Sequence, residues 1–169
     1  LRKMVIQVKK TDSMQEKPQG DASLAGAMYT VYDQKQNEVD QIEIGSDQTG
    51  RSKKLPVGIY TVKETKAPCG YNLDETVYTV DGEKGDKELE LITYEICSKE
   101  KVIEGSLKII KTLENPDSRS KEEIPAKGVR FTYYLKSDPD NKMTITLDET
   151  GTGQSGKMPY GIYQLEEET

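Results

Sequence analysis

Apolar and polar residues alternate over short stretches through most of this chain. The alternation is clear at residues 5–9, 27–32, 39–44, 59–64, 76–80 and 88–96. A period of two is typical of β-strands with one buried face, and no segment keeps a helical period beyond two turns. The last two stretches flank the turn residues 82–85, so we expect them to form a closing hairpin. The pattern predicts an all-β fold built as an antiparallel, immunoglobulin-like β-sandwich.

A block of this pattern occurs twice in the chain. Leu55-Pro-Val-Gly-Ile-Tyr60, followed by Glu64, returns as Met158-Pro-Tyr-Gly-Ile-Tyr163, followed by Glu167. The two glutamates are 167 − 64 = 103 residues apart. Three further blocks recur in the same order: the strand end at Lys10 with that at Lys111, residues 24–32 with 126–134, and 47–50 with 148–151. A repeat of this length is one domain long.

The repeat predicts two tandem modules, residues 1–103 and 104–169. The charged segment 99–104 lacks turn residues and is expected to be a short, stiff linker. Strands of the second module are expected at 107–110, 129–135, 143–147 and 162–165, with a long polar loop at 113–123. The second copy has no counterpart of the Ala67–Tyr71 turn or of the two strands after it. We therefore expect an unfinished domain, completed by further chain beyond Thr169 or by a strand from a neighbouring molecule.

Composition and charge restrict the function. Hydrophobic residues make up only 33% of the chain, so each small module has a thin core and would benefit from a covalent staple. The net charge is −6 with dispersed Lys and Arg, which argues against a nucleic-acid partner. No apolar run approaches the ~18 residues of a membrane span. Neither a signal peptide nor a cell-wall sorting tail is visible in the sequence.

The sequence offers little for metal binding or enzymatic turnover. It has no histidine, and its two cysteines cannot complete a tetrahedral zinc site. The acidic stretches 81–86 and 138–141 lack calcium-loop spacing and are typical of turns. No nucleophile–base pair is visible. We expect no metal, no cofactor and no enzymatic activity beyond, at most, a single self-modification.

The repeated motifs resemble the Cna protein B-type domain, in the form found in SpaA-type pilins of Gram-positive bacteria. The resemblance covers residues 5–71 and, more loosely, 106–169. Its motifs are Lys10, Leu24-Ala-Gly-Ala27, Ser46-Asp-Gln-Thr-Gly50, Leu55-Pro-Val-Gly-Ile-Tyr60 with Glu64, and Ala67-Pro-Cys-Gly-Tyr71.

The resemblance implies an extracellular, cell-wall-anchored protein. It implies stalk modules of a pilin or adhesin, with other pilin subunits or host surface ligands as partners. The alternative is an adhesive module that contacts host matrix or a carbohydrate. An exposed aromatic patch would favour this alternative, and the candidates for it are Tyr133, Tyr134 and Tyr160.

The resemblance also implies a covalent crosslink. In this family a first-strand Lys and a later-strand Glu flank an Asn or Asp of the last strand inside the core. Burial favours a neutral amine and a protonated acid, and close contact lets the amine attack the acceptor to form an isopeptide bond. Lys10 and Lys111 are then the crosslink lysines, and Glu64 and Glu167 the glutamates that promote the reaction. Alternation places Glu64 on the same inward face as Tyr60 and Val62.

The acceptor is where this chain departs from the family pattern. Residues 87–99 contain no Asn or Asp, and Cys97 or Ser98 stands at the acceptor position. Neither side chain can form an amide, so the acceptor is unknown. We expect Lys10 and Glu64 to persist as an ion pair without a crosslink. In the second module the acceptor strand is missing, while Asn115 and Asn141 lie in a loop and a turn.

The two cysteines offer a different staple. A Cys69–Cys97 bridge would close a loop worth about 3 kcal/mol by the loop-entropy argument, and such bridges persist in exported proteins. Gram-positive surface proteins use disulfides sparingly, so we expect the two thiols to stay unbridged.

Overall fold

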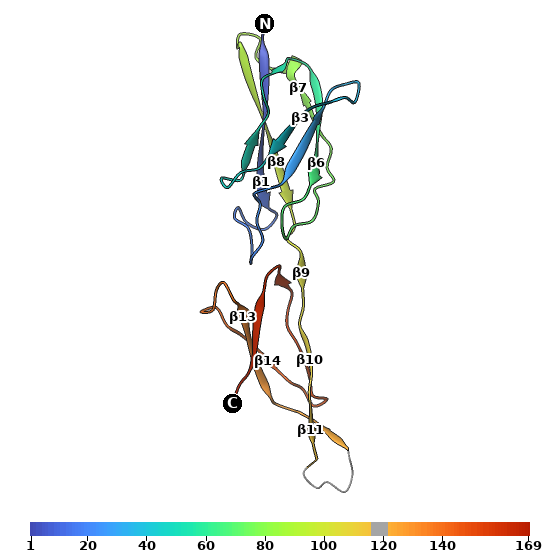
Figure 1. Cartoon of the computed structure of the whole chain (residues 1–169), viewed down its shortest axis with the longest axis vertical. Coiled ribbons are helices and arrows are strands. Elements are labelled where there is room, and N and C mark those ends of the chain that lie inside the picture. Colours follow the sequence, from blue (N-terminus) through green and yellow to red (C-terminus); the bar gives the residue numbers. More distant parts are fainter. Residues whose placement is uncertain (116–121) are drawn as a thin grey trace. The chain divides into compact units, whose positions relative to one another are not determined.

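The structure is a computed structural model that describes residues 1–115 and 122–169 (Figure 1). It divides into two compact units, residues 1–103 and 104–169. Each unit is built from β-strands, and within the described residues no helix is long and apolar enough to cross a membrane. The predicted all-β class is confirmed.

The first unit is a sandwich of two four-stranded sheets. In one sheet, β1 (Lys3–Asp12) has β4 (Thr49–Arg51) and β5 (Leu55–Pro56) on one edge and β8 (Leu91–Glu100) on the other. The other sheet has the order β3 (Glu38–Glu43), β2 (Met28–Tyr32), β6 (Ile59–Lys66), β7 (Tyr78–Asp81). Alternate residues of both sheets point inward and form one core, including Ile6, Val8, Val31, Ile42 and Val62.

The predicted closing hairpin is wrong. Strand β7 pairs with β6 in one sheet, whereas β8 pairs with β1 in the other and runs parallel to it over ten residues. The short 3-10 helix η1 (Gly82–Lys84) starts the crossover between the sheets. A Cβ on Gly82 would lie 2.5 Å from Met4 Sδ and 2.9 Å from the Gly58 carbonyl, so only glycine fits there. Alternation reveals which face of a strand is buried, but not the strand beside which it lies.

The predicted linker at residues 99–104 is also mostly wrong. Strand β8 continues to Glu100, and Val102 is 3% exposed within a small cluster with Leu24 and Tyr71. Val102 also pairs with Tyr71 as an isolated β-bridge. The Tyr71 hydroxyl donates to Asp12 Oδ2 at 2.6 Å and closes this end of the unit. Residues 99–103 are thus held to the first unit by the end of β8, by the buried Val102 and by the Ile103 amide, which donates to the Gly70 carbonyl at 2.8 Å.

The second unit contains shorter strands. Strand β13 (Arg130–Leu135) lies between β14 (Met143–Thr146) and β17 (Tyr163–Glu167). Two-stranded pairs complete it: β10 (Lys108–Ile110) with β15 (Thr152–Gln154), β9 (Glu104–Gly105) with β16 (Met158–Pro159), and β11 (Thr112–Glu114) with β12 (Glu123–Pro125). Strands β11 and β12 include both ends of the predicted polar loop at 113–123, a correction to that prediction. Residues 116–121 of the loop lie outside the described residues.

The two units share local geometry where their sequences repeat. The Ile6 amide donates to Ser52 Oγ at 2.9 Å, and the Leu107 amide donates to Ser155 Oγ at 2.8 Å. The repeated tyrosines each donate to the carbonyl of the proline four residues earlier, at 2.7 Å for Tyr60 and 2.8 Å for Tyr163. The β1–β4 and β10–β15 ladders also place a glycine at the same register position.

Candidate functional site

The structure brings Lys10 and Glu64 together inside the first unit. Lys10 lies on β1 and Glu64 on β6, so the pair joins the two sheets of the sandwich. Both side chains are fully buried, with Lys10 Nζ 2.8 Å from Glu64 Oε1. The ammonium also donates to the Tyr29 hydroxyl at 3.0 Å and lies over its ring. Isolated charges are very costly in a core, and direct pairing explains how these two are accommodated.

Three further side chains, of which sequence reasoning had named only Ser98, extend this pair into a network. The Tyr29 hydroxyl donates to Ser98 Oγ at 2.5 Å, and Ser98 donates to Asp74 Oδ2 at 2.6 Å. Tyr78 donates to the same Asp74 oxygen at 2.6 Å. The Asp74 backbone amide donates to Glu64 Oε2 at 2.5 Å and closes the ring. The network therefore connects β1, β2, β6, β7 and β8, with Asp74 in the loop before β7.

Asp74 carried no usable signal in the sequence. It lies in a polar loop past the last family-like motif, between Leu73, 42% exposed, and the exposed Glu75. Its own side chain is nearly buried, at 4% exposure. The one local hint is the Asp-x-Thr spacing, since Asp74 Oδ1 accepts the Thr76 amide at 3.0 Å in an Asx turn. Such turns are normally solvent-exposed, so the spacing does not predict burial.

The electrostatics of the network give its two carboxyl groups different protonation behaviour. Burial raises the pKa of Glu64, and the neighbouring Lys10 only partly opposes this. Burial alone would also raise the pKa of Asp74, but hydrogen bonds from Ser98, Tyr78 and Thr76 outweigh it and leave the pKa below its ordinary value. The pKa of Tyr78 rises to about 12 through burial and its bond to Asp74. Asp74 therefore stays ionised while Glu64 is the first to take up a proton.

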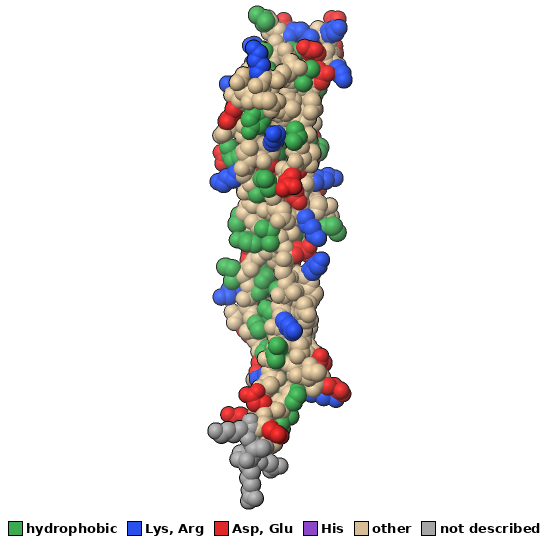
Figure 2. Space-filling view, turned by 90° about the vertical axis from the view of Figure 1, so that its right-hand side faces the viewer, with side chains coloured by type: hydrophobic (Ala, Val, Ile, Leu, Met, Phe, Trp, Pro, Cys, Tyr) green, Lys and Arg blue, Asp and Glu red, His purple; other side chains and the backbone are tan. Residues whose placement is uncertain are grey.

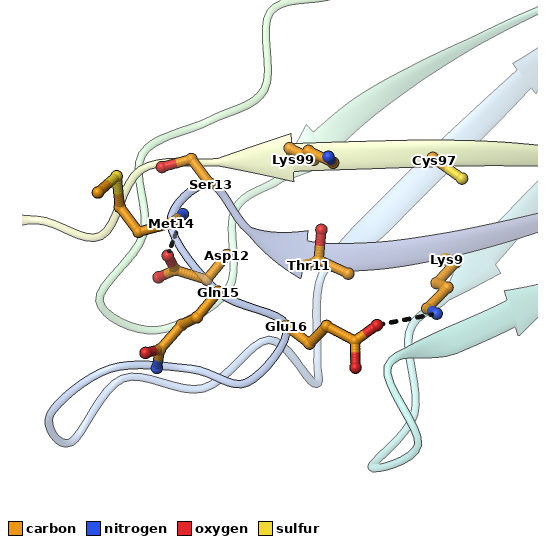
Figure 3. A pocket seen from close by; sticks show the side chains of 9 residues that line it. All are labelled: Lys9, Thr11, Asp12, Ser13, Met14, Gln15, Glu16, Cys97 and Lys99. Carbon is orange, nitrogen blue, oxygen red and sulfur yellow. Dashed lines mark hydrogen bonds and ion pairs between the residues drawn. The ribbon is translucent and has the colours of Figure 1, made fainter.

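The geometry identifies Ser98, not Cys97, as the residue at the acceptor position. Ser98 is the register partner of Lys10 on the parallel strand β8 and is completely buried. Cys97 is exposed on the opposite face, beside Lys9 and Lys99 in an open hollow (Figure 3). A serine hydroxyl cannot condense with an amine to form an amide. Asp74 is an ionised and therefore poor electrophile, so the network holds the sheets together through hydrogen bonds and charge.

A pH titration of the first unit should show opposite effects of these two acids. The raised pKa of Glu64 means that its contribution to stability grows as the pH falls toward its ordinary value of 4.5. The lowered pKa of Asp74 means that its contribution is lost as the pH falls below 3.8. As the pH is lowered from 7 to 3, the urea concentration at the midpoint of unfolding should thus first rise and then fall. In the Asp74→Asn variant the urea midpoint should fall less at the acidic end of the titration. An unchanged fall would show that Asp74 is not its cause.

The cysteines lie apart from this network. Cys69 and Cys97 are both exposed and are not joined by a disulfide. An alkylating reagent should therefore label two thiols per chain in the folded, unreduced protein, as read by intact mass. Labelling that appears only after reduction would show that a bridge had formed.

In the second unit the corresponding pair is more open. Lys111 Nζ lies 2.6 Å from Glu167 Oε2, but the two side chains are 28% and 43% exposed. Phe131 replaces Tyr29, so the ammonium lies 5.9 Å from a ring that has no hydroxyl. Within residues 104–115 and 122–169 no side chain takes the place of Ser98 or Asp74. Each Lys–Glu pair identified from the sequence is present, but only the first is enclosed.

Within residues 1–115 and 122–169, neither unit offers an evident metal site. Among the described residues, no three His, Cys, Asp or Glu side chains gather in a way that could hold an ion.

Comparison with known families identifies the first unit. Residues 5–95 match the model of the SpaA family, described as a prealbumin-like fold domain. The chain belongs to this family. The match covers Lys10, Glu64 and Asp74 but ends within β8, before Ser98.

Solved structures show the same fold. The *Bacillus anthracis* TIE protein is 26% identical with a TM-score of 0.74, over 99% of this chain and 29% of that one. A C-terminal fragment of the pilus adhesin SpaC from *Lactobacillus rhamnosus* GG is 17% identical with a TM-score of 0.58, over 99% of this chain and 76% of the fragment. This chain thus spans less than a third of the *Bacillus anthracis* protein. No curated protein shows a significant sequence match.

Proposed function

We propose that the chain is a stalk segment of a Gram-positive pilin or adhesin, outside the cell and anchored to its wall through other parts of the protein. Its role is mechanical and proteolytic stability, not turnover of a substrate. Its partners are other pilin subunits. The second unit is proposed to be a further domain of the same family. The observation that carries the proposal is the enclosed Lys10–Glu64 pair, which ties the two sheets of a SpaA-family domain together.

The strand order supports a role under tension. Strands β1 and β8 are the first and last of the unit and lie parallel over ten residues. Pulling the two ends of the unit apart slides these strands against each other. Their hydrogen bonds are then loaded together instead of opening one by one. The register pair Lys10 and Ser98 lies near one end of this ladder. There the hydrogen bond from Tyr29 on β2 to Ser98 on β8 joins the two sheets.

The surface gives less support to an adhesive module. Of the three tyrosines that sequence reasoning offered for an aromatic patch, Tyr133 is 6% exposed and Tyr134 donates to Glu166. Only Tyr160 is largely exposed, at 41%. On the face shown in Figure 2, basic and acidic side chains are interspersed among scattered apolar ones. Binding to host matrix or a carbohydrate therefore remains the second candidate.

Single-molecule pulling on the full chain tests the proposal. The first unit should unfold only at a high force, as expected of a domain whose end strands are loaded in shear. It should release its full chain length on unfolding, because no crosslink shortens it. Ser98→Ala should lower its unfolding force, while Cys97→Ala, on the outward face of the same strand, should leave the force unchanged. Unfolding at negligible force in the unaltered chain, or specific capture of a host matrix protein or glycan, would overturn the stalk assignment.

A further inference from the structure

Strand β8 leaves one long sheet edge of the first unit without a partner strand. The Ser13 amide donates to the Glu100 carbonyl at 2.9 Å, so the even-numbered residues of β8 direct their backbone groups toward β1. The odd-numbered residues direct theirs to the opposite edge, because backbone groups alternate along a strand. Within residues 1–115 and 122–169, no strand pairs with that opposite edge. An unpaired edge is a template for a further strand.

The open part of this edge ends with β8. Beyond it, the Asn72 amide donates to the Lys101 carbonyl at 3.4 Å, and the Ile103 amide donates to the Gly70 carbonyl at 2.8 Å. Lys101 and Ile103 are odd-numbered, so these bonds lie on the same side of the chain as the open edge. Segment 70–72 therefore covers the edge beyond β8 and leaves residues 91–99 open.

The other edges of the first unit carry features that discourage pairing. Strands β4, β5 and β7 have three, two and four residues, and β5 contains Pro56. Strand β3 lies beside a register shift at Val31 and Tyr32, and its Asp40 accepts the Lys53 amide at 2.7 Å. Strand β8 has ten residues and no proline, and it pairs with β1 without a register shift. Because native proteins shorten, interrupt or cover their edges, β8 is the edge best suited to a partner strand.

We propose that β8 pairs with β8 of a second copy of this chain, in antiparallel orientation about a two-fold axis at Cys97. Charge complementarity selects this partner and this register. Glu95, Cys97 and Lys99 share the exposed outward face of β8, where Figure 3 shows Cys97 and Lys99. With the axis at Cys97, Glu95 of each copy lies opposite Lys99 of the other, so symmetry provides two favourable pairs. An axis at Glu95 would place two carboxylates opposite each other.

The paired segment is short, which sets the strength of the association. Residues 95–99 of each copy form the ladder, because segment 70–72 already covers the edge beyond β8. Two free copies should therefore associate weakly, whereas copies held close together in an assembly should pair. The pairing extends the proposed stalk function by holding neighbouring stalk segments side by side. Association is measured without load, so this inference and the load-bearing role can fail separately.

Charge reversal tests the register. In sedimentation of the reduced full chain, the average mass should rise with concentration toward that of two copies. Glu95→Lys and Lys99→Glu should each weaken association at least about tenfold, because like charges then lie opposite each other. An equal mixture of these two variants should associate again, since every facing pair is then opposite in charge. Lys3→Glu reverses a charge on the outward face of β1, away from the edge, and should have no effect.

Crosslinking of Cys97 tests the axis. Residues paired at the axis have Cα atoms about 5.5 Å apart, so a bismaleimide with a short spacer should join the two Cys97 thiols in the Cys69→Ser variant. Moving the thiol with Thr93→Cys and Cys97→Ser should abolish crosslinking, because the two positions 93 then lie about eight residues apart along the ladder.

Three outcomes would overturn the proposal. The first is a mass that stays that of one copy up to about 1 mM. The second is a mixture of the two charge variants that associates no better than either variant alone. The third is equal crosslinking from positions 93 and 97, which would mean that any association does not run through β8 in this register.

Discussion

Lys10→Met is expected to destabilise the first unit by about 3–5 kcal/mol, and Glu64→Gln by less. Removing Lys10 leaves a fully enclosed carboxylate without its cation, whereas the raised pKa of Glu64 means that a neutral group at its place is tolerated better. The double variant should lose much less than the sum of the two single losses, because it removes both charges together. Urea unfolding followed by amide exchange of residues 1–103 measures the first unit separately from the second.

The second unit supplies a matched control. Lys111→Met and Glu167→Gln remove a pair of the same chemistry that is partly exposed to water. Exposed ion pairs contribute about 0–1 kcal/mol, so the two variants should be nearly neutral for the second unit. Additive losses at Lys10 and Glu64, or equal losses in the two units, would mean that enclosure does not set the strength of the pair.

Ser98→Asn is expected to convert the ion pair into a covalent bond. An asparagine at position 98 would face Lys10 across the parallel ladder. Its side chain carries an amide carbon on Cβ, where serine carries only a hydroxyl. The Lys10 amine would attack the side-chain amide carbon, form an amide and release one ammonia, with Glu64 carrying the proton between them. The intact mass should fall by one ammonia, and the first unit should become resistant to heat and protease.

Two variants control this experiment. Ser98→Asn combined with Glu64→Gln should keep the full mass, because the proton carrier is gone. Cys97→Asn should also keep the full mass, because position 97 is on the outward face. A folded Ser98→Asn protein that keeps its full mass would show that the absence of an acceptor is not what prevents the crosslink.

Local pattern predicted the parts of the site that lie on regular strands. Alternation places Tyr60, Val62 and Glu64 on one inward face, and all three are buried. The family resemblance, not the alternation, paired Lys10 with Glu64 and Lys111 with Glu167, and both pairs are in contact. The alternation succeeds where it does because the period of a strand determines which side chains face the core.

The parts that failed depend on contacts distant in sequence. The parallel pairing of β8 with β1 is set by the crossover between sheets, which the alternation of β8 itself does not encode. Asp74 is buried because Ser98 and Tyr78, from two different strands, converge on it. Val102 is held by Tyr71 across the end of the unit. Each depends on a partner that a one-dimensional pattern cannot identify.

The pairing of β1 with β8 also determines when the first unit can fold. Its longest ladder joins the two ends of the unit, which gives it a high contact order and slow folding. A chain that passes through a narrow channel from one end cannot form this ladder until residues 91–100 have also emerged. Until then the sheet that contains β1 lacks its last strand. The sandwich of the first unit can therefore close only after its whole length is available to fold.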